Sequence, residues 1–207
     1  FVMMTYPEIG NTGINISDME SRAPFLNGFI INNYNVPSNF RSEESLQAFL
    51  KRNNIPCISG VDTRALTVKL RNSGTLKGFM HCSSEKISDQ EGVKRAAEWC
   101  GLTNQDYASK VSCTEAYDWD AFPERTLSWG VATELPPAEF KVVAYDFGIK
   151  WNILRSMRLC GMDVHVVPAR TPAEEVLKLK PNGVFLSNGP ADPAALLARR
   201  CWSRGSW

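Results

Sequence analysis

Val184–Pro193, which reads VFLSNGPADP, is the part of the chain whose residues are best placed to do chemistry. An apolar run leads directly into a turn that holds a glycine and two prolines. Glycine lets the backbone approach a ligand closely and prolines stiffen a turn, so the Gly189 N–H could stabilise an oxyanion as it forms. Taken without its neighbours, however, the segment reads more simply as a turn that ends a strand.

Two other short motifs suggest ligand chemistry but favour a structural interpretation. Asp146–Gly148 reads DFG and stands between an apolar strand and a helix, where an aspartate most often caps the helix or forms the turn. No glycine-rich loop, strand lysine or HRD segment accompanies it, so the spelling does not indicate a kinase. Gly10–Gly13 reads GNTG but lacks the Lys-Ser/Thr of a phosphate-binding loop, which favours a tight turn.

The composition is that of an ordinary globular protein without a strong charge. The 207 residues are 43% hydrophobic, and 23 Lys and Arg nearly balance 22 Asp and Glu, so we expect neither a nucleic-acid nor a membrane partner. The six cysteines contain no C-x-x-C pair, which favours reduced thiols over a zinc site or a disulfide framework. His81 and His165 each stand in an alternating apolar stretch and are interpreted as strand residues without a catalytic role.

The elements that must position these residues begin with an α+β module from Phe1 to about Trp119. Side chains that can cap a helix, apolar residues at helical spacing and short apolar runs define its elements. The predicted elements are a helix capped by Ser42 that carries Leu46, Phe49 and Leu50, a strand Ile55–Ser59, a helix that starts at Asp62 or Thr63 and stops near Gly74, a strand Leu76–Cys82, and a helix with a Ser88–Glu91 capping box that ends at Gly101. The chain begins with Phe1 inside a strand-like run, so we expect the amino end of this domain to be missing.

Residues 121–140 contain three prolines and no sustained periodicity, so they read as a connection between domains. Beyond them, strands and helices alternate with short connections, which predicts right-handed crossovers and a parallel sheet covered on both faces. The predicted elements are strand Lys141–Asp146, helix Lys150–Cys160, strand Asp163–Val167, a helix capped by Thr171 with Pro172 and Glu174, and strand Gly183–Leu186. Ligands bind such sheets at the carboxyl ends of the strands, here Phe147–Lys150, Pro168–Arg170 and Ser187–Asp192.

Seven segments spread along the chain carry a family resemblance. They are Thr5–Asn15, Pro37–Ser42, Leu50–Thr67, Ser112–Tyr117, Lys141–Arg155, Val166–Leu177 and Gly183–Pro193. In order and spacing they are similar to the small, glutamine-hydrolysing subunit of carbamoyl-phosphate synthase. The resemblance covers nearly the whole chain up to Pro193, and so many matching segments make it far more specific than any single motif.

The resemblance implies an α/β fold in two parts. An N-terminal α+β small-subunit domain, which docks on the large synthetase subunit, would precede the first βαβαβ part of a flavodoxin-like class I glutamine amidotransferase domain. We place the N-terminal domain, lacking its start, at residues 1–120 and a linker at residues 121–140. A truncated amidotransferase domain would occupy residues 141–193, and an aberrant tail residues 194–207.

The activity that the resemblance implies is the hydrolysis of L-glutamine. A cysteine thiolate, activated by histidine and a carboxylate, attacks the side-chain amide, forms a glutamyl thioester and releases ammonia. The large subunit, or a fused synthetase domain, uses ATP and a divalent metal to make carbamoyl phosphate from bicarbonate and this ammonia, so no cofactor is expected in this chain. Reduced cysteines suit the cytoplasm or the stroma of a plastid or another organelle, and the product could serve arginine or pyrimidine synthesis.

The glutamine and oxyanion site is implied at two positions of the SNGPADP turn. Gly189 matches a family glycine whose N–H helps to bind glutamine and to stabilise the oxyanion, and one such donor is worth about 3 kcal/mol in enzymes generally. The family's second turn glycine falls at Ala191. Where that position needs a positive φ, a methyl group costs about 1 kcal/mol or shifts the turn.

The catalytic residues of the family have no counterpart in this sequence. A G-I-C-L-G-H-Q nucleophile elbow should follow the SNGP turn by one helix and an H-x-E pair should come later, but neither is present. Cys201 lies in ARRCWSRGSW, without an elbow glycine or a nearby histidine, and cannot replace the nucleophile. We therefore expect a chain truncated at both ends and inactive alone. The alternatives are a non-catalytic interaction protein that retains only the docking domain and an independent flavodoxin-like ligand-binding module, against which the similarity before Ala121 argues.

Overall fold

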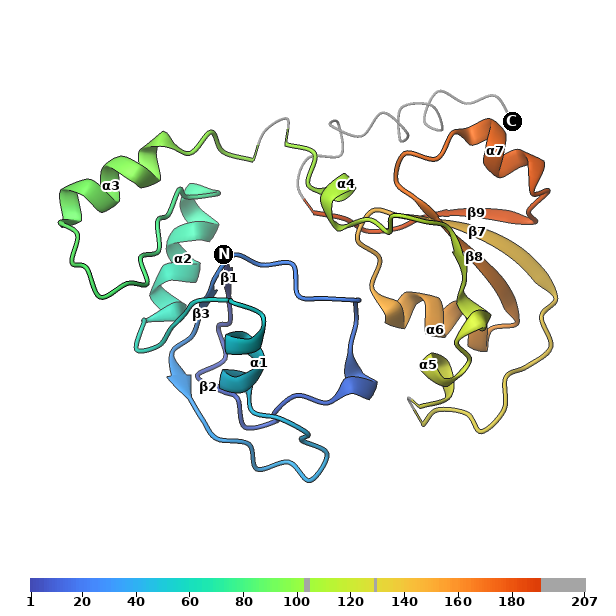
Figure 1. Cartoon of the computed structure of the whole chain (residues 1–207), viewed down its shortest axis with the longest axis horizontal. Helices are drawn as coiled ribbons and strands as arrows, with labels where there is room; N and C mark the ends of the chain where they lie inside the picture. Colours follow the sequence, from blue (N-terminus) through green and yellow to red (C-terminus); the bar gives the residue numbers. More distant parts are fainter. Residues whose placement is uncertain (103–104, 129, 191–207) are drawn as a thin grey trace. The chain divides into compact units, whose positions relative to one another are not determined.

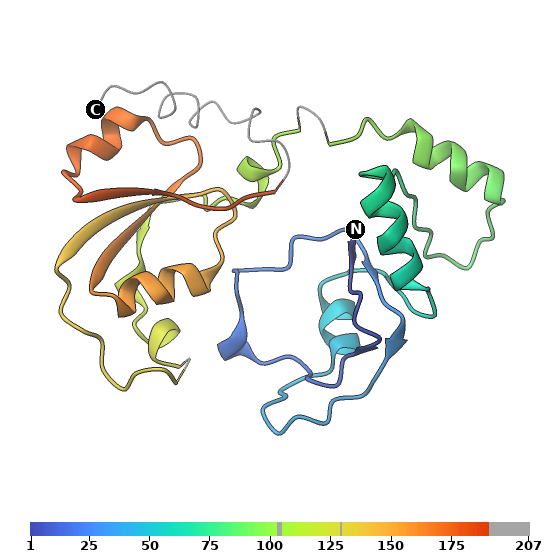
Figure 2. The same ribbon diagram turned by 180° about the vertical axis from the view of Figure 1, so that it is seen from behind.

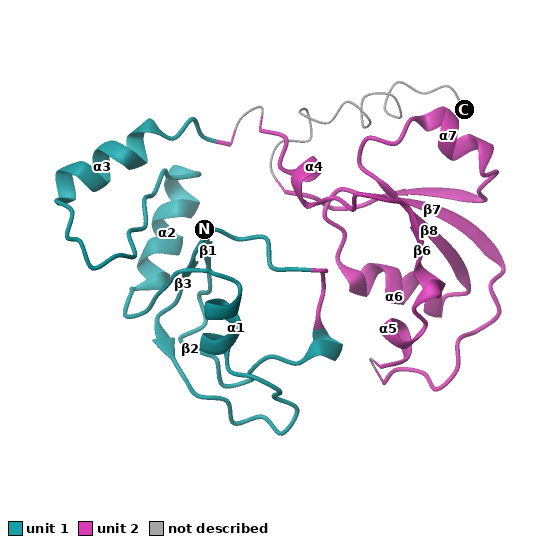
Figure 3. Cartoon of the chain, in the orientation of Figure 1, with its two compact units in different colours: residues 1–18, 23–101 teal, residues 19–22, 102–207 magenta. Residues whose placement is uncertain are grey.

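A computed structural model describes residues 1–102, 105–128 and 130–190, which fall into two compact units (Figure 3). The first unit comprises Phe1–Asp18 and Ala23–Gly101, and the second comprises Met19–Arg22 and the chain from Leu102 onward. The four residues Met19–Arg22 thus belong to the second unit although the first unit encloses them in sequence. Each unit is described by itself below.

Short strands and helices make up the first unit. Its strands form a parallel three-stranded sheet in the order β1-β3-β5 and a parallel pair, β2 with β4; their bounds are Val2–Met3, Glu8–Ile9, Phe29–Ile30, Asn33–Tyr34 and Cys57–Ile58 for β1 to β5. The helical elements are η1 (Ile16–Asp18), α1 (Leu46–Arg52), α2 (Thr63–Ser73) and α3 (Asp89–Glu98). The unit is the mixed α+β module that the sequence predicts.

Local side-chain caps start all three α-helices of the first unit. Asp62 accepts the Ala65 N–H at 2.9 Å and Ser88 accepts the Glu91 N–H at 3.2 Å, which confirms both predicted caps. The predicted cap of α1 is wrong, because Ser45 and not Ser42 accepts the N–H of Ala48. The Ser42 hydroxyl instead donates to the backbone oxygen of Glu44 at 3.1 Å.

The strand predicted at Leu76–Cys82 is also wrong. The segment has no strand geometry, and Leu76 and Phe79 are exposed. Its alternating apolar residues find no partner strand in the described part of the unit, and alternation without a hydrogen-bonded neighbour does not make a strand. His81 consequently does not stand in a strand, and one of its ring nitrogens lies 2.6 Å from the backbone oxygen of Glu85.

Four strands in the order β6-β8-β7-β9 form the sheet of the second unit (Figure 1). β7 pairs in parallel with both β8 and β9, which confirms the parallel sheet expected from the sequence. β6 was not predicted; it runs antiparallel to β8, with Tyr117 opposite Val166. The bounds are Tyr117–Asp118 for β6, Phe140–Asp146 for β7, Met162–Pro168 for β8 and Gly183–Leu186 for β9.

Helices cover both faces of this sheet (Figures 1 and 2). Successive residues of β7 point to opposite faces, so Tyr145 packs in one buried cluster with Val176 of α7, while Ala144 packs in another with Leu154 of α6. The helical elements are α4 (Ala108–Val111), η2 (Trp119–Ala121), α5 (Glu124–Leu127), α6 (Trp151–Leu159) and α7 (Ala173–Lys178). In the ranges that the structure describes, no helix has the length and apolar character needed to cross a membrane.

The start of α7 differs from its prediction. Thr171 was expected to cap the helix in a box with Glu174, but the cap residue is Pro172, and its side chain makes no capping hydrogen bond. The backbone oxygen of Thr171 instead accepts the hydroxyl of Tyr145 at 3.0 Å. This contact joins the turn before α7 to β7, one of the two inner strands of the sheet.

The compact units divide the chain at Gly101, earlier than the domain limit predicted at residue 120. The reason is that β6 and η2 pack on the sheet of the second unit, where Trp119 is fully buried. The stretch expected to be a linker, residues 121–140, contributes α5, whose buried Thr126 accepts the indole N–H of Trp119 at 2.8 Å. The compact units are defined by contacts in the structure, so the predicted domain limits at residues 120, 140 and 193 stay a prediction.

A distant segment caps the amino end of α6. The cap position, Lys150, makes no side-chain capping hydrogen bond. Instead, the Trp151 N–H donates to the backbone oxygen of Glu20 at 3.0 Å, and the Asn152 N–H donates to the Glu20 carboxylate at 2.9 Å. The buried guanidinium of Arg155 adds a hydrogen bond to the backbone oxygen of Met19 at 3.0 Å. These bonds explain why the segment 19–22 belongs to the second unit.

Replacing Glu20 by Ala should destabilise the second unit. The substitution leaves the Asn152 N–H without its acceptor and removes a negative charge from a helix amino end, so we expect the free energy of unfolding to fall by about 1 kcal/mol. Urea denaturation followed by tryptophan fluorescence would measure this loss. Glu139→Ala is the matched control, because Glu139 is exposed and its carboxylate hydrogen-bonds no described residue. Equal stability of the two variants would contradict the capping role.

Candidate functional site

Two of the three strand ends predicted to bind ligands lie against each other. The turn after β7 and the turn after β9 are joined by two hydrogen bonds: the Ser187 hydroxyl accepts the Phe147 N–H at 3.0 Å, and the Asn188 amide donates to the Gly148 backbone oxygen at 3.2 Å. The third predicted strand end, at Pro168–Arg170, makes its hydrogen bonds with the segment around α4 and not with these two turns. Its backbone donates to the hydroxyl of Ser112, and its arginine pairs with Asp106 near α4.

Glycine is required at both contact points between the two turns. A Cβ on Gly189 would overlap the backbone oxygen of Phe147 and lie 2.9 Å from its Cβ. Gly148 has φ +106°, a conformation that side chains rarely adopt, and a Cβ there would lie 2.8 Å from Cγ2 of Val111. The missing side chain of Gly189 therefore allows the backbones of the two turns to approach each other, while that of Gly148 allows its positive φ and the nearby Val111 side chain.

The Gly189 N–H is not used by the described part of the fold. Gly189 is exposed, and its N–H donates to no other residue in the described ranges. An N–H held by the surrounding backbone in this way can stabilise a negative charge without having to reorganise. Gly189 as an oxyanion donor remains a prediction, and Ala191, the other predicted site residue, lies outside the described residues.

Asp146 organises the turn after β7. One of its carboxylate oxygens accepts the N–H groups of Gly148 and Ile149, both at 2.8 Å, and the other accepts the N–H of Cys113 at 2.7 Å. The residue is 7% exposed. The DFG aspartate therefore has the structural, turn-forming role that the sequence favours, and its acceptor atoms are occupied by backbone donors.

Cys113 is the cysteine beside these turns, but it is not an activated thiol. Burial, followed by the charge of Asp146 and a hydrogen bond to it, raises the pKa of Cys113 to about 12. A nucleophilic cysteine needs the opposite environment, which lowers the thiol pKa. His165, the histidine of the same unit, hydrogen-bonds the Asp118 carboxylate at 2.6 Å and not this thiol. These residues therefore do not supply a thiolate beside the two turns.

Comparison with known proteins accounts for both units. Residues 1–80 match the family model "Carbamoyl-phosphate synthase small chain, CPSase domain", and residues 143–203 match the model "Glutamine amidotransferase class-I". A carbamoyl phosphate synthase small chain from Syntrophotalea carbinolica is 46% identical over 193 residues, which are 93% of this chain and 50% of that protein. The chain is a homologue of carbamoyl phosphate synthase small chains. The resemblance inferred from the seven sequence segments is thereby confirmed.

Relatives from other lineages align in the same way. The chloroplastic small chain of Oryza sativa subsp. japonica is 46% identical over 198 residues, covering 95% of this chain and 43% of the relative. The small chain of Pectobacterium atrosepticum is 44% identical over 199 residues, covering 93% and 50%. The chain thus spans about half the length of the curated relatives it matches. The class I amidotransferase match includes both turns, with Gly148 and Gly189.

Sequence reasoning missed two contacts that build the site. The bond from the Cys113 N–H to Asp146 joins residues 33 positions apart, and the bond from Asn152 to Glu20 joins residues 132 positions apart. Neither leaves a local pattern such as a helical period or a capping box. The segment Ser112–Tyr117 stood out only through its family resemblance, which was the one available signal.

Gly189→Ala should destabilise the second unit, because the added methyl group meets the Phe147 backbone, which cannot move without disturbing β7. We expect a loss of about 1–3 kcal/mol in the free energy of unfolding, the usual cost of overpacking. Gly183→Ala is the control: a Cβ there meets only Cγ2 of Val142, at 4.0 Å, so its effect should stay within about 0.5 kcal/mol. Urea titrations of both variants would measure the difference, and equal losses would refute the close approach.

Cys113 should react slowly with iodoacetamide in the folded protein. In the folded protein a pKa of about 12, against an ordinary value of 9.0, lowers the thiolate population at pH 8 roughly 1000-fold relative to the urea-unfolded chain. A thiolate of higher pKa is the stronger nucleophile, which offsets part of this loss, so we expect a rate about 30- to 100-fold lower. Peptide mapping by mass spectrometry would give both rates. Because the folded pKa is raised, the folded rate should still be climbing at pH 10, whereas the unfolded rate levels off. A folded rate that levels off near pH 9 would contradict the raised pKa.

Proposed function

We propose that this chain is the glutamine amidotransferase component of a carbamoyl-phosphate synthase. In this role it would bind L-glutamine and deliver ammonia to a large subunit, or to a fused synthetase domain, that makes carbamoyl phosphate. The observation that carries the proposal is the 46% identity to a carbamoyl phosphate synthase small chain over 93% of the chain, with both family models matched in order. ATP and a divalent metal would bind to the synthetase partner.

The geometry of the Gly189 turn supports this function. When a thiolate attacks the side-chain amide of glutamine, the carbonyl oxygen becomes an oxyanion that needs a preorganised donor. The exposed Gly189 N–H, held against the Phe147 backbone, is such a donor. Collapse of the tetrahedral intermediate would release ammonia and leave a glutamyl thioester, which water then hydrolyses.

The chain of 207 residues would not carry out this hydrolysis alone. It contains no G-I-C-L-G-H-Q elbow and no H-x-E pair, and Cys113 is held as a neutral thiol. The carbamoyl phosphate made by the assembled synthase would serve arginine or pyrimidine synthesis. The cytoplasm and a plastid or other organelle stroma are both suitable locations, since its relatives include bacterial and chloroplastic proteins.

A glutaminase assay on the purified 207-residue chain tests the proposed inactivity. We expect ammonia release from L-glutamine to equal that of a blank without protein, and Cys201→Ser to change nothing. Release above the blank that disappears in Cys201→Ser would overturn this expectation.

The docking role is tested separately, by co-purification of the tagged chain with a carbamoyl-phosphate synthase large subunit. We expect the large subunit to be retained, and the complete gene product to hydrolyse glutamine in the complex. A complete gene product that binds the large subunit but never releases ammonia would instead support a non-catalytic interaction protein.

A further inference from the structure

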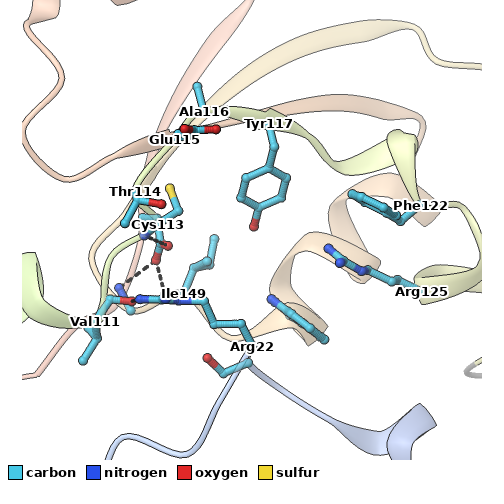
Figure 4. A pocket seen from close by; sticks show the side chains of 14 residues that line it. Arg22, Val111, Cys113, Thr114, Glu115, Ala116, Tyr117, Phe122, Arg125 and Ile149 are labelled. Atoms are coloured by element: carbon cyan, nitrogen blue, oxygen red, sulfur yellow. Dashed lines mark hydrogen bonds between the residues drawn. The ribbon is translucent and has the colours of Figure 1, made fainter.

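The second unit contains a cavity of about 460 Å³ beside the Asp146 turn (Figure 4). Every residue that lines it belongs to this unit. Figure 4 shows the ring of Tyr117 reaching into the cavity, with Phe122 and Arg125 on one side of it and Cys113 and Thr114 on the other. Its size is within the range of small-molecule sites in proteins, about 300–1000 Å³.

Arg125 supplies a positive charge to one wall of the cavity. Its guanidinium carbon lies 4.0 Å from the ring centre of Phe122 and 4.9 Å from that of Trp151. The group is half-buried and has no hydrogen-bond acceptor among the residues that the structure describes. Two rings so close to the guanidinium fix its position and leave its five N–H donors to be satisfied by something else.

The Tyr117 hydroxyl adds a second donor. Burial, together with the charge of Asp146, raises the pKa of Tyr117, while the charges of Arg125 and Arg22 oppose the rise. The hydroxyl therefore stays protonated at neutral pH and can donate a hydrogen bond. In the described ranges it has no partner of its own.

The other charged groups around the cavity are already engaged or stand at its edge. Both oxygens of Asp146 accept backbone N–H groups, and Arg22 donates to the backbone oxygen of Ser112 at 2.9 Å. Glu115 is exposed. Arg125 thus provides the charge that is free to bind a ligand, between aromatic side chains that suit an apolar group.

We propose that this cavity binds a small organic carboxylate, with the carboxylate on the guanidinium of Arg125 and the hydroxyl of Tyr117 and the apolar body against Phe122, Trp151 and Ile149. A carboxylate is favoured over a phosphate because Arg125 offers one positive charge, which balances the single charge of a carboxylate, whereas a phosphate group carries about −1.5 to −2 charges at neutral pH. This site goes beyond the proposed glutamine hydrolysis and does not depend on it.

An NMR titration of the 207-residue chain with benzoate tests the proposal. The indole N–H signals of Trp151 and Trp119 serve as reporters, because the centres of these rings lie 4.9 and 5.8 Å from the guanidinium carbon of Arg125. We expect these signals to shift with a dissociation constant of about 1 mM or tighter, a reasonable affinity for so small a ligand. Benzamide, which has the same shape without the charge, should bind at least tenfold more weakly.

Variants separate the site from non-specific binding. Arg125→Gln should weaken benzoate binding at least tenfold, and Tyr117→Phe by about threefold to tenfold, as expected for a charged and a neutral donor. Arg95→Gln is the matched control, since Arg95 also lies over a ring, that of Phe79 at 5.4 Å, but does not line the cavity. Its benzoate affinity should be unchanged.

Three results would overturn the proposal. They are equal binding of benzoate and benzamide, unchanged benzoate affinity in Arg125→Gln, and tighter binding of inorganic phosphate than of benzoate. Circular dichroism and thermal unfolding of each variant verify the fold. If Arg125→Gln does not fold, Tyr117→Phe serves as the test instead, because it removes one oxygen and leaves Arg125 stacked on Phe122 and Trp151. Unchanged benzoate affinity in Tyr117→Phe would then refute the proposed site.

Discussion

The second unit depends on one buried carboxylate, that of Asp146. It is 7% exposed and binds three backbone N–H groups from two parts of the chain, those of Gly148 and Ile149 just after β7 and that of Cys113 ahead of β6. An uncompensated charge at this depth would be costly, so the three donors and the carboxylate hold one another in place. The turn that results sets Gly148 against Gly189, raises the pKa of Cys113 and forms part of the wall of the carboxylate-binding cavity.

Two buried arginines on α6 extend this organisation to the irregular parts of the unit. Arg155 donates to the backbone oxygens of Met19 and Arg125, and Arg158 donates to the carboxylate of Asp120 and to the backbone oxygen of Pro136. A planar guanidinium can bind several acceptors in fixed directions, so each arginine joins segments that have little regular structure. This explains how a stretch with three prolines, which the sequence suggests is a free linker, becomes part of a packed unit. It also places the backbone of Arg125, and with it the charged wall of the cavity, relative to α6.

Elements held by contacts between residues close in the sequence could be predicted, whereas elements held by contacts between distant segments could not. The strands of the parallel sheet are continuous apolar runs, and caps such as Asp62 and Ser88 reach an N–H three residues away, so both leave local patterns. The predicted cap of α1 was wrong because two serines, Ser42 and Ser45, stand close together in the sequence and either could cap a helix. The local pattern does not distinguish between them, and in the structure Ser45 is the cap. β6, the Glu20 cap of α6 and the stacked guanidinium of Arg125 rest on contacts between distant segments, which no periodicity encodes. The family resemblance located Gly189, but only the fold explains why that position admits no side chain.

Gly189 combines two requirements that sequence comparison alone cannot separate. The absence of a Cβ is demanded by the Phe147 backbone, a packing constraint that would hold even in a protein without activity. The exposed N–H, in contrast, contributes nothing to the packing of the described residues, and an unused donor at a strand end is what an oxyanion needs. Packing thus fixes the position of this N–H in the free protein, as the proposed role in stabilising an oxyanion would require. In the proposed glutamine hydrolysis the thiolate would have to come from a group other than Cys113, because burial and the charge of Asp146 raise the pKa of that thiol.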